Sequence, residues 1–130
     1  MIVVNGGTDS QKKYALSLTY FVCSKFGISP EIDINIKRMG TDDNYGYCCH
    51  LEDDEFEVDV KQTLRLRDFL INLAHELVHV KQYVMNEMPK KLSGVDYWDR
   101  PHEIEAHGRE LGLFLQWCKS ENIKGKWTME

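Results

Sequence analysis

The chain has 130 residues, of which 42% are hydrophobic and 28% are charged. This is the size and composition of one soluble globular domain, which argues against global disorder and leaves enough residues for a core. The formal net charge is −5 and no block of Lys or Arg stands out, which argues against nucleic acid as a partner. No apolar run approaches the ~20 residues that cross a bilayer, so no membrane partner is expected.

The cysteines and the first residues together favour a reducing compartment. Four cysteines occur, none in a C-x-x-C pair, and free thiols are typical of reducing conditions: Cys23, Cys48, Cys49 and Cys118. Residues 1–6 lack the charged and long apolar regions of a signal peptide. We therefore expect a cytoplasmic protein with a single domain over residues 1–130, in which residues 119–130 form a loosely ordered tail.

The first half of the chain predicts one helix and three strands. Side-chain oxygens for an N-cap at residues 8–10 precede a helical pattern that ends at about Phe26, and Gly27 is a suitable C-cap. Apolar residues then alternate with polar ones over residues 31–37, 45–51 and 56–60, with turns expected at residues 40–44 and 52–54. Because the connections are short, we predict a three-stranded antiparallel sheet and an α+β fold.

A central helix, predicted from about Arg67 to Asn86, contains the run His75-Glu76-Leu77-Val78-His79. Apolar residues cover most sides of this helix, and the two histidines fall in a separate polar sector. Positions i and i+4 share a helix face, so His75 and His79 can hold one metal ion while Glu76 flanks it. Two imidazoles beside a carboxylate are typical of a hydrolytic Zn²⁺ site.

A catalytic zinc site normally takes a third protein ligand, and the last predicted helix, residues 101–119, offers three candidates. Helix geometry favours Glu103, which shares its face with Ala106 and borders the apolar side. Glu105 falls on a face that reads as solvated, and His102 remains a further alternative. The compact H-E-x-x-H-x-x-G-x-x-H pattern is excluded, because Gln and Met stand at positions 82 and 85.

The H-E-x-x-H run, followed 24 positions later by Glu103-Ile104-Glu105-Ala106-His107, resembles the gluzincin metallopeptidases. The order of the predicted elements is also similar to the catalytic half of thermolysin-like enzymes and to the small ImmA-like peptidases. The resemblance implies a zincin-like core with one Zn²⁺ per chain, held by His75, His79 and Glu103. It further implies peptide-bond hydrolysis of a peptide or protein substrate, with Glu76 as the general base acting on a metal-bound water.

The resemblance assigns roles to three further parts of the chain. Tyr97, six positions before Glu103, lies where thermolysin-like enzymes carry a tyrosine that stabilises the oxyanion, with Tyr83 as the next candidate. His107 stands where the family has an aspartate that accepts a hydrogen bond from a ligand histidine. The strand at residues 45–51 is a candidate for binding substrate by strand addition.

Two other classes of protein remain open from the sequence. The first is a non-catalytic zinc domain in which His102 or His50 supplies a fourth ligand and closes the site. The second is a nucleic-acid-linked protease of the SprT-like kind, in which His102 replaces Glu103 as the third ligand. The acidic charge balance and the lack of a basic tail argue against the second class.

Overall fold

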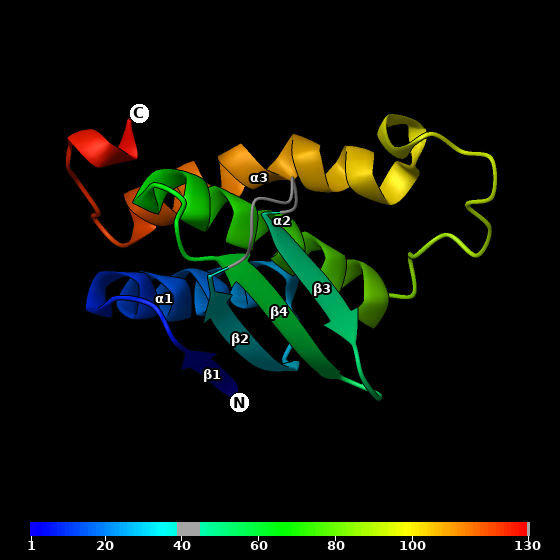
Figure 1. Ribbon diagram of the computed structural model, residues 1–130, viewed down its shortest axis with the longest axis horizontal. Coiled ribbons are helices and arrows are strands. Elements are labelled where there is room, and N and C mark those ends of the chain that lie inside the picture. Colours follow the sequence, from blue (N-terminus) through cyan, green and yellow to red (C-terminus); the bar gives the residue numbers. More distant parts are fainter. Residues whose placement is uncertain (39–44, 130) are drawn as a thin grey trace.

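The computed structural model describes residues 1–38 and 45–129, which form an α+β fold with three α-helices and a four-stranded mixed sheet (Figure 1). The turn predicted at residues 40–44 lies outside the described residues. In chain order the elements are β1 Ile2–Asn5, α1 Asp9–Phe26, β2 Glu31–Lys37, β3 Gly46–His50, β4 Glu55–Lys61, α2 Leu66–Val84, the 3₁₀-helix η1 Tyr97–Asp99, α3 Pro101–Ser120 and the 3₁₀-helix η2 Lys126–Thr128.

The sheet differs from the predicted three-stranded antiparallel arrangement. Its strand order is β1-β2-β4-β3, in which β1 and β4 both pair with β2 in parallel and β3 pairs with β4 antiparallel. The predicted positions of β2, β3 and β4 and the antiparallel pairing of β3 with β4 are confirmed, but β2 pairs with β4 in parallel, which contradicts the antiparallel meander. Alternation of apolar and polar residues has a period of two in either direction, so it cannot tell a parallel pair from an antiparallel one.

The helices pack on one face of the sheet. On β2 and β4 every second side chain is buried, and the buried set consists of Ile32, Ile34, Ile36, Phe56, Val58 and Val60. In Figure 1, α1 and α2 lie on the far side of the sheet and α3 lies along α2. The core therefore sits between the sheet and α2, which places α2 in the centre of the molecule.

The predicted ends of α1 are confirmed in detail. Thr8 caps the first turn, since its hydroxyl accepts a hydrogen bond from the Gln11 backbone N–H while the Gln11 side chain accepts one from the Thr8 N–H. Gly27 takes the left-handed conformation, with φ 68°, and its backbone N–H bonds the last turn.

The segment after α3 packs on the core through Trp127. This ring lies 5.5 Å from Tyr14 on α1 and 6.3 Å from Phe114 on α3. The Arg67 Nε on α2 donates a hydrogen bond to the Thr128 carbonyl at 3.1 Å. The last residues thus contact all three helices.

None of the helices in the described residues has the length and hydropathy that would let it span a bilayer.

Candidate metal centre

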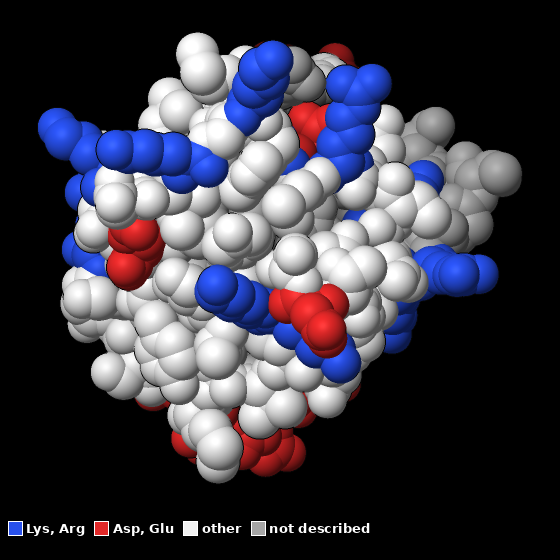
Figure 2. All heavy atoms as spheres, turned by 90° about the vertical axis from the view of Figure 1, so that its left-hand side faces the viewer, with Lys and Arg blue, Asp and Glu red and all other residues white. Residues whose placement is uncertain are grey.

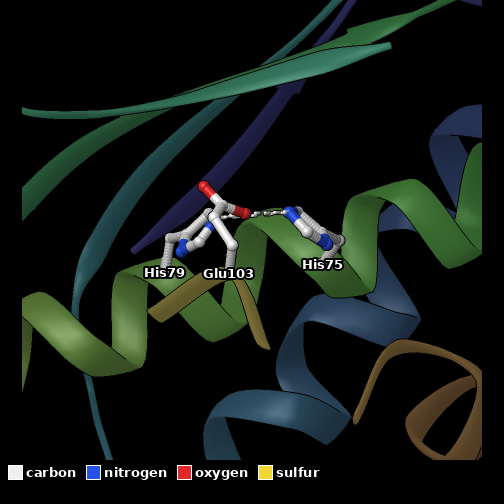
Figure 3. A group of neighbouring side chains, drawn as sticks. All are labelled: His75, His79 and Glu103. Carbon is white, nitrogen blue, oxygen red and sulfur yellow. Dashed lines mark hydrogen bonds and ion pairs between the residues drawn. The ribbon is translucent and has the colours of Figure 1, made fainter. Parts of the chain in front are cut away.

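Helix α2 is buried over most of its length, including its polar sector. His75, Glu76 and His79 are each only 7% exposed, although they are polar. The two histidines lie one turn apart on the side of α2 that α3 covers, and Glu103 approaches them from α3 (Figure 3). Buried polar groups need partners, so the contacts of these side chains determine what the site can do.

Three donor atoms converge at this position. The Glu103 Oε1 lies 3.0 Å from the His75 Nε2 and 3.1 Å from the His79 Nε2, and the two Nε2 atoms are 3.2 Å apart (Figure 3). A tetrahedral ion with bonds of about 2.0–2.1 Å would space its ligands roughly 3.3 Å apart. The cluster therefore has the dimensions of three corners of a metal coordination tetrahedron, and the protein can hold a metal ion at His75, His79 and Glu103.

The hydrogen-bond partner of each Nδ1 determines which ring nitrogen of His75 and His79 carries the lone pair. The His75 Nδ1 lies 3.1 Å from the Glu110 carboxylate, which only accepts hydrogen bonds when ionised. The Gln82 amide nitrogen donates to the Glu105 carboxylate and to the His102 carbonyl, so the Gln82 Oε1 is the atom that faces His79. The His79 Nδ1 lies 2.7 Å from this oxygen. Both Nδ1 atoms therefore carry the proton in the neutral rings, and both Nε2 lone pairs point at the Glu103 carboxylate.

Three converging lone pairs repel each other unless a cation or a proton lies between them. The pKa of His75 reflects this: burial lowers it, but hydrogen bonds to Glu103 and Glu110 outweigh burial and raise it to about 9. Burial also lowers the pKa of His79, but its hydrogen bonds, above all the one to Glu103, outweigh burial and raise it. Although burial opposes it, hydrogen bonds from the two histidines hold the pKa of Glu103 well below its usual range. The cluster thus favours a bound positive charge.

Glu76 lies beside the cluster without joining it. It lines a cleft of about 300 Å³ together with the three ligand residues and the first residues of β3. Burial raises its pKa to about 7, a suitable value for a general base near neutral pH. A Cβ at Gly46 would lie 3.2 Å from the Glu76 Oε2 and 2.9 Å from the Asp59 carbonyl oxygen. Gly46 therefore leaves the space that the Glu76 carboxylate occupies.

The Tyr97 hydroxyl faces the cluster from η1. It lies 3.1 Å from the Glu103 Oε1 and 2.9 Å from the His107 Nε2, and the ring lines the same cleft. Burial and the neighbouring Glu103 carboxylate raise the pKa of Tyr97 far above its usual value. The hydroxyl therefore stays protonated and can donate a hydrogen bond into the cleft. Tyr83 also lines the cleft, but its ring packs against His50 and Phe56, which stack on each other.

The carboxylate that orients His75 is Glu110, which the sequence analysis did not assign. We expected His107 to accept the hydrogen bond from a ligand histidine, but His107 stacks on His75, with ring centroids 4.4 Å apart, and donates its Nδ1 proton to Glu110 at 2.9 Å. Glu110 follows Glu103 by seven positions, two helical turns, on the same face of α3. That spacing was the signal that could have identified it. Gln82, three positions after His79, was missed in the same way.

The alternative ligands of the sequence analysis lie elsewhere. We expected the face of α3 that carries Glu105 to be solvated. Instead, Glu105 binds the buried Lys81 at 2.9 Å and Gln82 at 2.9 Å. His102 is 7% exposed and lies beside the cluster, with its Nε2 3.5 Å from the other Glu103 oxygen and its Nδ1 without a partner among the described residues. His50 is exposed and bonds the Asp53 carbonyl at 2.7 Å. Neither histidine joins the three-atom cluster of the described residues.

Comparisons with known proteins found no matching family model, no matching curated protein and no matching solved structure.

Proposed function

We propose that this protein is a zinc-dependent metallopeptidase of the gluzincin type, with a zincin-like fold. The single observation that carries the proposal is the convergence of the His75 Nε2, the His79 Nε2 and the Glu103 Oε1 within 3.2 Å of one another. Two imidazoles and one carboxylate form a ligand set that suits zinc, and the H-E-x-x-H run supplies a carboxylate beside them. Zn²⁺ bound there would lower the pKa of a water ligand and polarise a carbonyl oxygen.

Other residues of the cleft support the proposal. Glu76, with its pKa raised to about 7, takes a proton from the attacking water and delivers it to the leaving amine. The protonated Tyr97 hydroxyl donates a hydrogen bond to the oxygen that gains charge in the transition state. Strand β3, which is the last strand in the order β1-β2-β4-β3 and lines the cleft at residues 46–48, binds an extended peptide by strand addition.

The cluster supports a catalytic site rather than a closed structural one. A structural zinc site uses four protein ligands, whereas a catalytic site keeps one position open. Among the described residues the cluster has three ligands, and all three line the cleft. His102, the fourth ligand considered from the sequence, has its Nε2 3.5 Å from the Glu103 Oε2 and is outside the cluster. This arrangement favours the peptidase over the non-catalytic zinc domain.

The metal content of the purified protein tests the ligand set. We expect about one zinc per chain by elemental analysis after gel filtration, and loss of stoichiometric zinc in His79→Ala. His50→Ala is the matched control, because it removes an exposed histidine of β3 that is outside the cluster, and it should retain zinc. Full zinc retention in His79→Ala would contradict the proposed centre.

A second experiment separates metal binding from chemistry. Glu76→Gln keeps the size of the side chain and removes the base, so it should hold zinc normally and cleave a quenched-fluorescence peptide library at least about 10²-fold more slowly. Glu57→Gln on the exposed face of β4 is the control and should cleave at the native rate. Equal cleavage by Glu76→Gln and the native protein would exclude the general-base role.

A further inference from the structure

The charges of this protein are segregated between the two ends of the sheet. Because β1, β2 and β4 are parallel, their carboxyl ends meet at one edge and their amino ends at the other. Seven exposed acidic residues lie at or next to the amino ends of β2 and β4: Glu31, Asp33, Glu52, Asp53, Asp54, Glu55 and Glu57. The net charge of −5 therefore describes neither end of the molecule.

Basic residues gather at the opposite end. The beginning of α1, the carboxyl ends of β2 and β4, the beginning of α2 and the segment after α3 contribute the nine members of what we call the basic face: Lys12, Lys13, Lys37, Arg38, Lys61, Arg65, Arg67, Lys124 and Lys126. Figure 2 views this end, and Lys and Arg side chains extend across it. Among the described residues, the same segments carry four acidic residues: Asp9, Asp59, Asp68 and Glu121.

Contacts between these segments make them one continuous surface. The Gln11 side chain of α1 donates to the Gln62 carbonyl at 2.9 Å, and the Gln62 N–H donates to the Lys37 carbonyl at 2.8 Å. Lys37 and Lys61 are partners in the register of β2 and β4. On the other side, Arg67 bonds the Thr128 carbonyl at 3.1 Å, which holds the last segment against α2.

Most of these cations have no ion pair among the described residues. Lys37 pairs with Asp59 at 3.2 Å, but the described residues provide no ion pair for the other eight members of the basic face. The amino ends of α1 and α2 and the carboxyl end of α3 lie at this end (Figure 1), so two helix dipoles add positive potential to it and one opposes them. Cations without ion-pair partners among the described residues attract an extended polyanion.

We propose that the basic face binds the phosphate backbone of a nucleic acid. The cations come from five segments and cover a broad surface, which matches a polyanion rather than one small phosphate. Tyr45 lies at its rim, 49% exposed and 5.6 Å from the Lys61 ammonium, and provides a ring on which an unpaired base can stack. A membrane surface is a poorer match, because membrane-bound helices combine cations with an inserted apolar face, whereas the helices at this end bury their apolar sides in the core.

Fluorescence anisotropy with labelled nucleic acid tests the proposal. The probes are a mixed-sequence DNA duplex of about 20 base pairs and an RNA strand of about 20 nucleotides, both at about 50 mM salt. The double variant Lys12→Glu, Lys13→Glu should weaken binding of the better probe at least about tenfold. Glutamates in the first turns of α1 favour the helix dipole, so the variant should fold.

The matched control is Lys90→Glu, Lys91→Glu. These two lysines are also adjacent and exposed, and they lie in the connection between α2 and α3 at the other end of the molecule. The control changes the net charge by the same amount, so it should weaken binding less than about threefold if the basic face is the site. A second face variant, Lys124→Glu with Lys126→Glu, should behave like the first.

The proposal is overturned if neither probe binds, or if the control pair weakens binding as much as the two face variants do. It is also overturned if the protein binds vesicles of phosphatidylcholine and phosphatidylserine but neither nucleic acid, since the partner would then be a membrane. The inference is independent of the peptidase proposal, because binding is measured without turnover and does not require zinc.

Discussion

The polar side chains between α2 and α3 are buried and face one another, whereas the cations of the basic face are exposed and mostly face solvent. His75, His79 and Glu103 lie within 3.2 Å of each other and have further partners behind them. The cations stand on five separate segments and, apart from Lys37, lack acidic partners among the described residues. The first region is organised for one small ion, and the second for an extended charged surface. The two regions should therefore respond differently to salt, to substitution and to pH.

The largest expected difference is in the response to salt. Displacement of counterions makes nucleic-acid affinity fall steeply with salt, so a face with this many cations should lose about 10³-fold in affinity between roughly 50 and 200 mM salt. Zinc content should not change over this range, because the ligands are buried and salt screens them weakly. Anisotropy titrations and elemental analysis at both salt concentrations measure the contrast. A flat salt response would show that binding is not through phosphates.

The next effect concerns the carboxylate behind His75. Glu110→Gln keeps a hydrogen-bond acceptor near the His75 Nδ1 but removes its charge, so zinc affinity should fall by about 10- to 100-fold. A competition titration with a chelator measures the affinity. Glu57→Gln, on the exposed face of β4, is the control and should leave zinc affinity unchanged. Nucleic-acid affinity should be the same in both variants. An equal loss of zinc affinity and nucleic-acid affinity in Glu110→Gln would mean that the two regions are coupled.

The sequence predicted the part of the metal centre that lies within one helix. His75 and His79 are four positions apart, and helix geometry alone brings them together. Glu103 was favoured because it borders the apolar side of its helix, which must pack against another element. Glu110 was missed because the family pattern directed attention to His107, although it is Glu110 that accepts the hydrogen bond from the His75 Nδ1. The contact between two helices, rather than the spacing within one, determines that choice.

The pairing of the strands and the basic face could not be predicted, because both depend on contacts between segments that are distant in the sequence. Periodicity located the strands but not their partners, and β1 was overlooked because four residues give too little alternation. The position of each cation was visible in the sequence, but their gathering depends on which strand ends meet at one edge. The net charge averages over both ends of the sheet and therefore argued against a nucleic-acid partner.

A smaller effect is expected at the Tyr97 hydroxyl. It has one proton and two neighbours, Glu103 and His107, so Tyr97→Phe removes a donor without removing a metal ligand. On the proposed mechanism kcat should fall about tenfold, with zinc content and KM nearly unchanged. Steady-state kinetics on a peptide from the library measures this. Tyr20→Phe, on the exposed side of α1, should have no effect, and a native kcat in Tyr97→Phe would exclude the oxyanion role.

The smallest effect concerns the ionic contact that holds α3 against α2. Lys81 is 7% exposed and bonds Glu105 at 2.9 Å and Glu87 at 2.6 Å, so removal of Glu105 leaves a buried ammonium with one carboxylate. Burial opposes ionisation of Glu105, but hydrogen bonds from Lys81 and Gln82 outweigh it and hold its pKa at about 2. We expect Glu105→Gln to lower the free energy of unfolding by about 1 kcal/mol at pH 7.

The sign of the pH dependence follows from the lowered pKa. A carboxylate whose pKa falls from 4.5 to about 2 on folding contributes stability that is fully present above pH 4.5 and is lost as the pH falls towards 2. The difference in unfolding free energy between the native protein and Glu105→Gln should therefore be constant from neutral pH to about pH 5 and shrink below that. Urea unfolding at a series of pH values measures it, with Glu57→Gln as an exposed control. A difference that grows on acidification would show that Glu105 is not bound as a carboxylate, and the contact between α2 and α3 would then rest on Gln82 and the buried apolar side chains.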